Sequence, residues 1–269
     1  MTRLARPSAR AAARTAPWRW AFVGAACGVI LALVLYAPAR WLAVTVTWAS
    51  QGHVALEDAQ GTVWSGSAQW VLAGGRGSRD AVALPSRLAW TLRPTLGGLA
   101  LAVQAPCCTL QPIDMQLRPT PQGLTVTLAD VAATHWPAQL LAGLGTPWNT
   151  LQLEGQLQLA AQGLQLQWTA GRLQVQGRAE LLALNMGSRL TTLRPMGSYR
   201  LALEGGAVAT LRLETLEGGL RLAGTGEWRA SGLHFSGVAT TAPQHAAVLA
   251  NLLNLIGRRE GDRSIITLG

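Results

Sequence analysis

Leucine alternates with glutamine, arginine or glutamate along much of the chain, and this period of two constrains the fold more than any other feature. The clearest runs are Leu151–Leu159, Leu164–Trp168, Leu173–Gln176, Leu211–Glu214 and Leu220–Leu222. Alternation places successive side chains on opposite faces of a β-sheet, so one face is apolar and the other is polar. From residue 40 onward the sequence therefore predicts a mainly β fold: an antiparallel meander that forms a curved sheet or a sandwich.

Glycine-containing pairs separate the alternating runs and predict hairpin turns. They are Gly74-Gly75, Gly97-Gly98, Gln122-Gly123, Gln162-Gly163, Gly205-Gly206 and Gly218-Gly219. Residues 134–149 interrupt the pattern. This interruption suggests a division of the β-rich region, 40–269, into halves at 40–133 and 147–269.

Two segments break the period of two and predict short helices. The first is His135–Gly143, which ends at a glycine. The second is Pro243–Ile256, where proline suits a first helical turn and Val248, Leu249, Leu252, Leu253 and Ile256 share one face. We expect this second helix to cover the apolar face of the sheet near the C-terminus.

The N-terminal region has the charge pattern of a membrane anchor. All 22 basic residues of the chain are arginines, five of them precede residue 20, and the first acid is Glu57. The uncharged stretch 20–39 is long enough to span a bilayer core of ~30 Å. Arginine-rich flanks remain in the cytoplasm. The sequence thus predicts a cytoplasmic basic tail (1–19), a single transmembrane helix (20–39) and a periplasmic β-rich domain (40–269).

A cleaved signal peptide is the alternative for this stretch, because Ala37–Ala39 loosely resembles a cleavage site. The apolar core of such a peptide usually has ~7–15 residues, which is shorter than this run. An uncleaved anchor is therefore favoured.

The residues that carry chemistry are sparse. The chain has no lysine, which excludes P-loop and pyridoxal-phosphate enzymes. Its histidines, His53, His135, His234 and His245, lack metal-ligand spacing, and there is no G-x-S-x-G motif. We therefore predict a protein that is not an enzyme and has no catalytic, cofactor-binding or metal-binding residues. Because the positive charge is concentrated in the short tail, we also predict no nucleic-acid binding.

Two features leave alternatives open. Cys107 and Cys108 are adjacent, so they form either a vicinal disulfide or two free thiols. Five tryptophans are predicted to lie in alternating strands, at Trp64, Trp70, Trp90, Trp168 and Trp228. They are either core residues of a thin sheet or the lining of an apolar groove for an acyl chain or a partner strand.

Three blocks of sequence resemble one known family, and the resemblance extends over nearly the full length. The blocks are Gly61–Ala68 (G-T-V-W-S-G-S-A), Met196–Arg200 (M-G-S-Y-R) and the terminal Leu255–Gly269. Together with the basic tail and the apolar stretch, they resemble type II secretion system protein N. The resemblance implies a single-pass inner-membrane protein with its bulk in the periplasm. It also implies a non-catalytic accessory or assembly role in exporting folded proteins across the outer membrane, with other secretion-system proteins as partners.

A different function is compatible with the same residues. An anchored sheet with one face of leucine and tryptophan also suits a protein that binds or transfers lipid in the periplasm. The discriminating feature is whether other elements cover the apolar face.

The charged C-terminal turn has two interpretations of its own. Either Ser264–Leu268 closes the sheet and the turn is solvated, or Arg258, Arg259 and Arg263 contact an acidic partner. The first interpretation is favoured.

Overall fold

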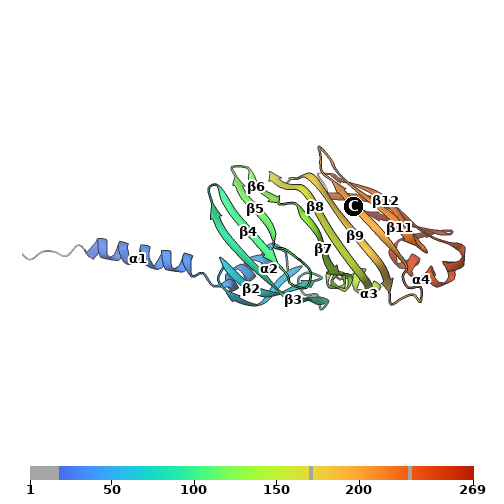
Figure 1. Cartoon of the computed structure of the whole chain (residues 1–269), viewed down its shortest axis with the longest axis horizontal. Coiled ribbons are helices and arrows are strands. Elements are labelled where there is room, and N and C mark those ends of the chain that lie inside the picture. The colour runs from blue at the N-terminus through green and yellow to red at the C-terminus, as the bar shows by residue number, and fades with distance from the viewer. Residues whose placement is uncertain (1–17, 170–171, 230–231) are drawn as a thin grey trace, which may run out of the picture. The chain divides into compact units, whose positions relative to one another are not determined.

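The computed structural model describes residues 18–169, 172–229 and 232–269, which fall into two compact units. The described part of the first unit contains one helix, α1 (Trp18–Leu35). The second unit, Pro38–Gly269, contains all the strands and the other helices (Figure 1).

The predicted continuous helix over 20–39 is wrong in extent. α1 ends at Leu35, and a second helix, α2 (Ala39–Ala49), begins after Pro38. Proline has no backbone N–H and disfavours helical geometry in the residue before it, so the helix is interrupted here. Among the helices of the described residues, none is both long enough and apolar enough to cross a membrane.

The expectation that β structure starts at residue 40 is also wrong, because α2 extends to Ala49. Its β-branched residues misled the prediction. Thr45 Oγ1 donates to the Leu42 carbonyl and Thr47 Oγ1 donates to the Ala43 carbonyl, so both hydroxyls bond within the helix.

The second unit is built on one antiparallel sheet, which confirms the predicted mainly β fold. The described residues contain fifteen strands in the spatial order β1-β2-β3-β4-β5-β6-β8-β9-β10-β11-β12-β13-β15-β14, with β7 paired to β8 beside that path. The strands are β1 (Val54–Gly61), β2 (Ser65–Ala73), β3 (Ala81–Thr95), β4 (Gly98–Gln104), β5 (Ile113–Thr120), β6 (Gly123–Leu128), β7 (Val131–Pro137), β8 (Leu153–Thr169), β9 (Arg172–Ser188), β10 (Gly197–Glu204), β11 (Ala209–Gly218), β12 (Leu220–Arg229), β13 (Gly232–Thr241), β14 (Arg258–Glu260) and β15 (Arg263–Leu268).

The long strand β8 joins the N-terminal strands of the sheet to the C-terminal ones. Its first part pairs with β7 and its last part pairs with β6, so the sheet continues across residues 134–149. The predicted turn at Gln162-Gly163 is wrong, because both residues lie inside β8 at a register shift. Gly163 has φ +56° there, and an extra residue in a bulge keeps the strand continuous.

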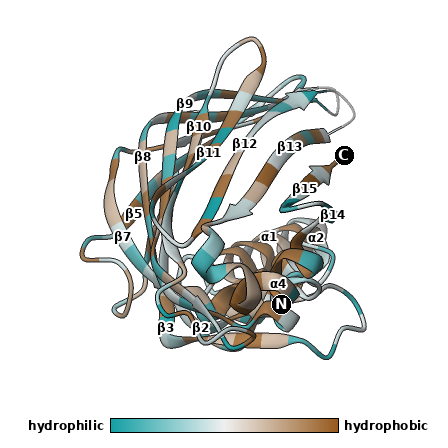
Figure 2. Ribbon diagram, turned by 90° about the vertical axis from the view of Figure 1, so that its right-hand side faces the viewer, coloured by the Kyte–Doolittle hydropathy of each residue, from teal (hydrophilic) through white to brown (hydrophobic). Residues whose placement is uncertain are grey.

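The register defines two faces. Directly paired residues share a face, and the pairs Trp90–Val103, Leu117–Val126 and Leu166–Val175 all lie on the face where the helices pack. We call this the inner face and the opposite one the outer face. The sheet is curved, and α2 and the C-terminal helix α4 lie on its concave side (Figure 2).

Helices cover one end of the inner face. They are α2, the 3-10 helix η1 (Ala138–Leu144), α3 (Trp148–Leu151), η2 (Pro243–His245) and α4 (Ala246–Ile256). The predicted covering helix at 243–256 is confirmed, since Leu249, Leu252 and Leu253 are buried against the sheet core. Val248, which was predicted to share that face, is 40% exposed.

The helix predicted at 135–143 begins later than expected. His135, Trp136 and Pro137 are the last three residues of strand β7, and the helical residues begin at Ala138. Trp136 packs between two parts of the core and lies edge-on to Trp70, with 5.9 Å between ring centroids.

Candidate functional site: the open inner face

The inner face of the sheet carries no charge from β1 to β13 among the described residues. Register assignments place Arg200 with Leu182 and Glu214 on the outer face, while Tyr199 and Leu201 lie on the inner face. The same alternation places the other charged strand residues on the outer face, and these include Arg87, Arg93, Asp114, Arg118, Glu154, Arg178, Glu180, Glu204, Arg212, Arg221 and Glu227. Any ligand of the inner face therefore meets an apolar surface.

Helices cover only one half of this face. The other half lies toward the β3–β4, β5–β6 and β10–β11 turns, and we call this end of the sheet the hairpin tips. In the covered half Trp90, Leu157 and Leu220 are 4%, 7% and 3% exposed. Near the tips Trp168 and Leu268 are 55% and 58% exposed. The uncovered part, which we call the open inner face, consists of Leu117, Leu124, Val126, Leu166, Trp168, Leu173, Leu203, Leu211, Trp228 and Leu268.

The five tryptophans considered from the sequence divide between the two interpretations. Trp90 is buried in the core and its indole N–H donates to the Val63 carbonyl at 3.1 Å. Trp70 is also in the core, and Trp64 lies in the turn between β1 and β2 rather than in a strand. Only Trp168 and Trp228 belong to the open inner face.

Sequence reasoning missed the aliphatic members of the open inner face, such as Leu124, Leu211 and Leu268. They follow the same alternation as the core leucines. Their only distinguishing signal is that Leu124 and Leu268 lie close to a turn or chain end, whereas exposure depends on where the helices pack.

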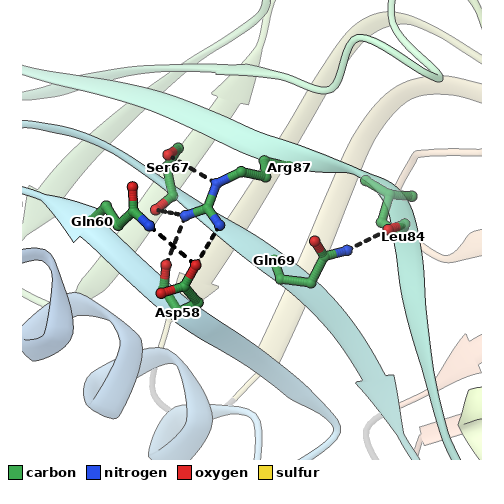
Figure 3. A network of polar contacts seen from close by, with 6 residues as sticks. All are labelled: Asp58, Gln60, Ser67, Gln69, Leu84 and Arg87. Atoms are coloured by element: carbon green, nitrogen blue, oxygen red, sulfur yellow. Dashed lines mark hydrogen bonds and ion pairs between the residues drawn. The ribbon is translucent and has the colours of Figure 1, made fainter.

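The outer face holds its charges in cross-strand networks. At the edge of the sheet, the Arg87 guanidinium lies 2.7 Å from Asp58 Oδ2 and donates to the Asp58 and Ser67 carbonyls. Gln60 also donates to Asp58 Oδ2, at 3.1 Å, and Gln69 donates to the Leu84 carbonyl (Figure 3). The hydrogen bond from Arg87 is the main cause that lowers the pKa of Asp58. This network ties β1, β2 and β3 together.

A second network crosses three central strands. Arg200 on β10 lies 2.7 Å from Glu180 on β9 and 2.9 Å from Glu214 on β11. The hydrogen bond to Glu214, followed by the charge of Glu180, raises the pKa of Arg200. Asp58 and Arg200 are on distant strands of the sheet, so the shifted groups do not converge on one pocket.

The histidines are dispersed. His53 precedes β1, His135 is on β7, His234 is on β13 and His245 ends η2. Within the described ranges, no three histidine, cysteine or acidic side chains are grouped to hold a metal ion.

Cys107 and Cys108 form a vicinal disulfide in the loop between β4 and β5, which resolves the choice between a bond and free thiols. Cys107 is exposed and its N–H donates to Ser86 Oγ at 3.2 Å, next to β3 residue Arg87. Cys108 is 4% exposed, and its carbonyl accepts the His135 N–H of β7 at 2.8 Å. The loop therefore bridges β3 and β7, which are not paired with each other.

The C-terminal segment forms strand β15 and pairs with β13, which confirms that Ser264–Leu268 extends the sheet. In the exposed turn Glu260 lies 2.5 Å from Arg258 and 3.7 Å from Arg263. Two of the three arginines that could contact an acidic partner already have an acidic neighbour.

Comparison with known proteins gives one match. The family model for type II secretion system protein N matches residues 52–266, a range that runs from just before β1 into β15. No curated protein and no solved structure matches the chain.

Proposed function

Because the chain belongs to the type II secretion system protein N family, we propose that it is a non-catalytic accessory or assembly component of that machine. It supports export of folded proteins across the outer membrane through protein–protein contacts in the periplasm. The observation that carries this proposal is the extent of the family match, residues 52–266, which coincides with the sheet. The part of the chain that the family model matches is thus the sheet. The described residues contain no cluster of titratable groups in one pocket, which agrees with a binding role.

The proposal includes an arrangement across the envelope. Residues 1–19 form a cytoplasmic tail, 20–39 an inner-membrane anchor and 40–269 the periplasmic domain. Support comes from the five arginines before residue 20 and the uncharged stretch that follows. Residues 1–17 of the tail lie outside the described residues. Protease accessibility in intact spheroplasts tests the arrangement: digestion of the C-terminal domain with protection of the tail is expected, and the reverse would contradict it.

Partner contacts on the outer face suit this sheet better than strand addition at its edges. The β1 edge has a register shift between Glu57 and Gln60, and its Asp58 is held by Arg87. The opposite edge, β14, has only three residues, all exposed and charged. Bulges, short edge strands and charges oppose pairing with another strand. The outer face of β8 and β9 instead presents a row of glutamines, Gln165, Gln167, Gln174 and Gln176, with hydrogen-bonding groups and no net charge.

Co-purification from gently solubilised inner membranes, scored by mass spectrometry, tests the proposed function. We expect secretion-system proteins with the unmodified chain and their loss in a Gln174→Glu/Gln176→Glu variant, whose two side chains are exposed. The Thr225→Glu/Ser236→Glu variant, also exposed on the outer face, is the matched control. Absence of secretion components from the unmodified sample, with export of a reporter intact in a strain lacking the chain, would overturn the proposal.

A further inference from the structure

We propose that the open inner face binds the acyl chains of an anionic phospholipid, with the head group beside the arginines at the hairpin tips. This ligand goes beyond the proposed protein contacts, which use the other face. The argument depends on the chemistry of the surface, its extent and the charge around it.

The members of the open inner face include no charged, hydroxyl or amide side chain. Its members are leucine, valine and tryptophan, and the inner-face neighbours Gly224, Gly226 and Phe235 add no polar group. A bound peptide would bring many backbone amides that need hydrogen-bond partners, whereas among its members this face offers only the indole N–H groups of Trp168 and Trp228. Acyl chains bring no such groups, so they match the surface without an unsatisfied donor or acceptor.

The open inner face is large enough for such chains. Its members from Leu124 to Trp228 lie on β6, β8, β9, β10, β11 and β12, which are successive neighbours in the sheet. Adjacent strands lie ~4.8 Å apart, so these six strands span about 24 Å. An acyl chain in one leaflet covers about half of the ~30 Å hydrocarbon core, about 15 Å.

The charge around the hairpin tips complements a phosphate group. Arg93, Arg118, Arg172 and Arg212 are exposed on the outer face near the tips, and none has an ion pair within the described ranges. Arginine is well suited to phosphate because its planar guanidinium donates two parallel hydrogen bonds.

The few acids at the same end do not cancel this charge. They are Glu204 and Glu227, and Glu227 is engaged by Arg229 at 2.9 Å. At the helix-covered end, in contrast, Glu154 is engaged by both Arg189 and Arg194. The net positive charge therefore gathers at the tips, on outer-face side chains beside the rim of the open inner face.

Site-specific photocrosslinking in the full-length chain tests the location. Benzoylphenylalanine replaces Leu124 or Leu211 on the inner face, and Thr127 or Thr210 on the outer face of the same two strands serve as matched controls. Cells are grown with radioactive phosphate and irradiated, and phospholipid adducts are counted. We expect at least fivefold more label at the inner positions. Equal labelling of both faces, or inner-face adducts to protein alone, including a second copy of this chain, would overturn the proposal.

The head-group contact is tested with purified full-length chain in neutral detergent. Bound dioleoylphosphatidylglycerol and dioleoylphosphatidylcholine are counted by native mass spectrometry. For the Arg93→Gln/Arg118→Gln/Arg172→Gln variant we expect at least threefold less phosphatidylglycerol and unchanged phosphatidylcholine. Arg258→Gln/Arg259→Gln/Arg263→Gln removes equal charge at the covered end and is the control. Equal losses in both variants would overturn the head-group placement, whatever the result for secretion partners.

Discussion

Phe235 shows how the absence of side chains at neighbouring positions lets a large residue pack on the sheet. Its buried ring lies on the inner face over the glycines of β12 and β13. A Cβ atom on Gly224 would lie 2.5 Å from Phe235 Cζ and 2.9 Å from the Cα atom of Gly237. These glycines therefore provide the room that lets an aromatic ring pack flat against two paired strands.

We expect Gly224→Ala to destabilise the protein by about 1–3 kcal/mol, because overpacking forces the ring and the backbone apart. Chemical denaturation followed by tryptophan fluorescence measures the change. Gly206→Ala is the control, since the nearest atom to its added Cβ would be 3.7 Å away. Equal stability of the two variants would show that the ring can move without cost.

Tyr199 predicts how stability responds to alkaline pH. Its side chain is 6% exposed, its hydroxyl donates to the Leu220 carbonyl at 3.1 Å, and burial raises its pKa above the ordinary value. Between the unfolded and the folded pKa, the folded state holds a proton that the unfolded state has lost. The stabilisation is therefore complete below the unfolded pKa of ~10 and decreases as pH rises above it.

For Tyr199→Phe we expect a loss of about 1 kcal/mol at neutral pH, from the missing hydrogen bond to the Leu220 carbonyl. Above pH ~10 its unfolding free energy should depend less on pH than that of the unmodified chain. Thermal melts from pH 8 to 11 measure both effects. Parallel pH profiles for the two proteins would refute the assignment to Tyr199.

The loop that carries the vicinal disulfide depends on a threonine for its shape. Thr109 is 5% exposed, and its hydroxyl accepts the Ala105 N–H at 2.9 Å and donates to the Ala105 carbonyl at 3.1 Å. The disulfide closes a ring between adjacent residues, so it restricts the unfolded chain very little.

We therefore expect Thr109→Val to destabilise the protein by about 1–3 kcal/mol, because it leaves a buried N–H without its acceptor. Reduction of Cys107–Cys108 should shift the melting temperature less than this substitution does. Melts with and without a strong reductant make the comparison, and Thr127→Val on β6 controls for loss of a hydroxyl in a strand. A larger effect of reduction would mean that the disulfide itself bridges β3 and β7.

The charged turn after α4 provides a fourth comparison. Because β15 is held by six pairs with β13, the sheet closes without the arginines of the turn. We expect Arg258→Gln/Arg259→Gln/Arg263→Gln to leave export and the melting temperature unchanged, as measured by a secreted reporter and by calorimetry. Loss of export without loss of stability would support contact with an acidic partner instead.

The accuracy of the sequence predictions differed among the elements for identifiable reasons. The strands with strict alternation, such as Leu153–Thr169, were predicted because burial of one face determines the period. α2 was missed because its threonines and valines favour strands locally, while its contacts with β1 and Trp90 are long-range. The bulge at Gly163 was taken for a turn, because glycine suits both conformations.

The division of the inner face into covered and open halves is a property of the whole domain. The sequence predicted an apolar face and a helix to cover part of it. It did not predict which leucines stay open, because Leu157 and Leu166 occupy equivalent positions in the alternation of β8. Only the packing of α2, η1 and α4 at one end separates them, and that packing joins residues far apart in the chain.

This division predicts an uneven stability along single strands. Covered residues such as Leu157 and Leu181 are packed in the main core, whereas Trp168 and Leu173 at the other end of the same hairpin are not. Regions with few buried apolar contacts open more readily and exchange amide hydrogens faster.

In purified full-length chain we expect amide hydrogen exchange to be at least tenfold slower over 153–161 than over 165–169, measured by mass spectrometry of peptides. Each segment pairs with a strand on both sides, so hydrogen bonding is matched between them. If the two segments exchanged at equal rates, a bound molecule would have to cover the open inner face already, and delipidation followed by a second measurement would show whether that molecule is a lipid.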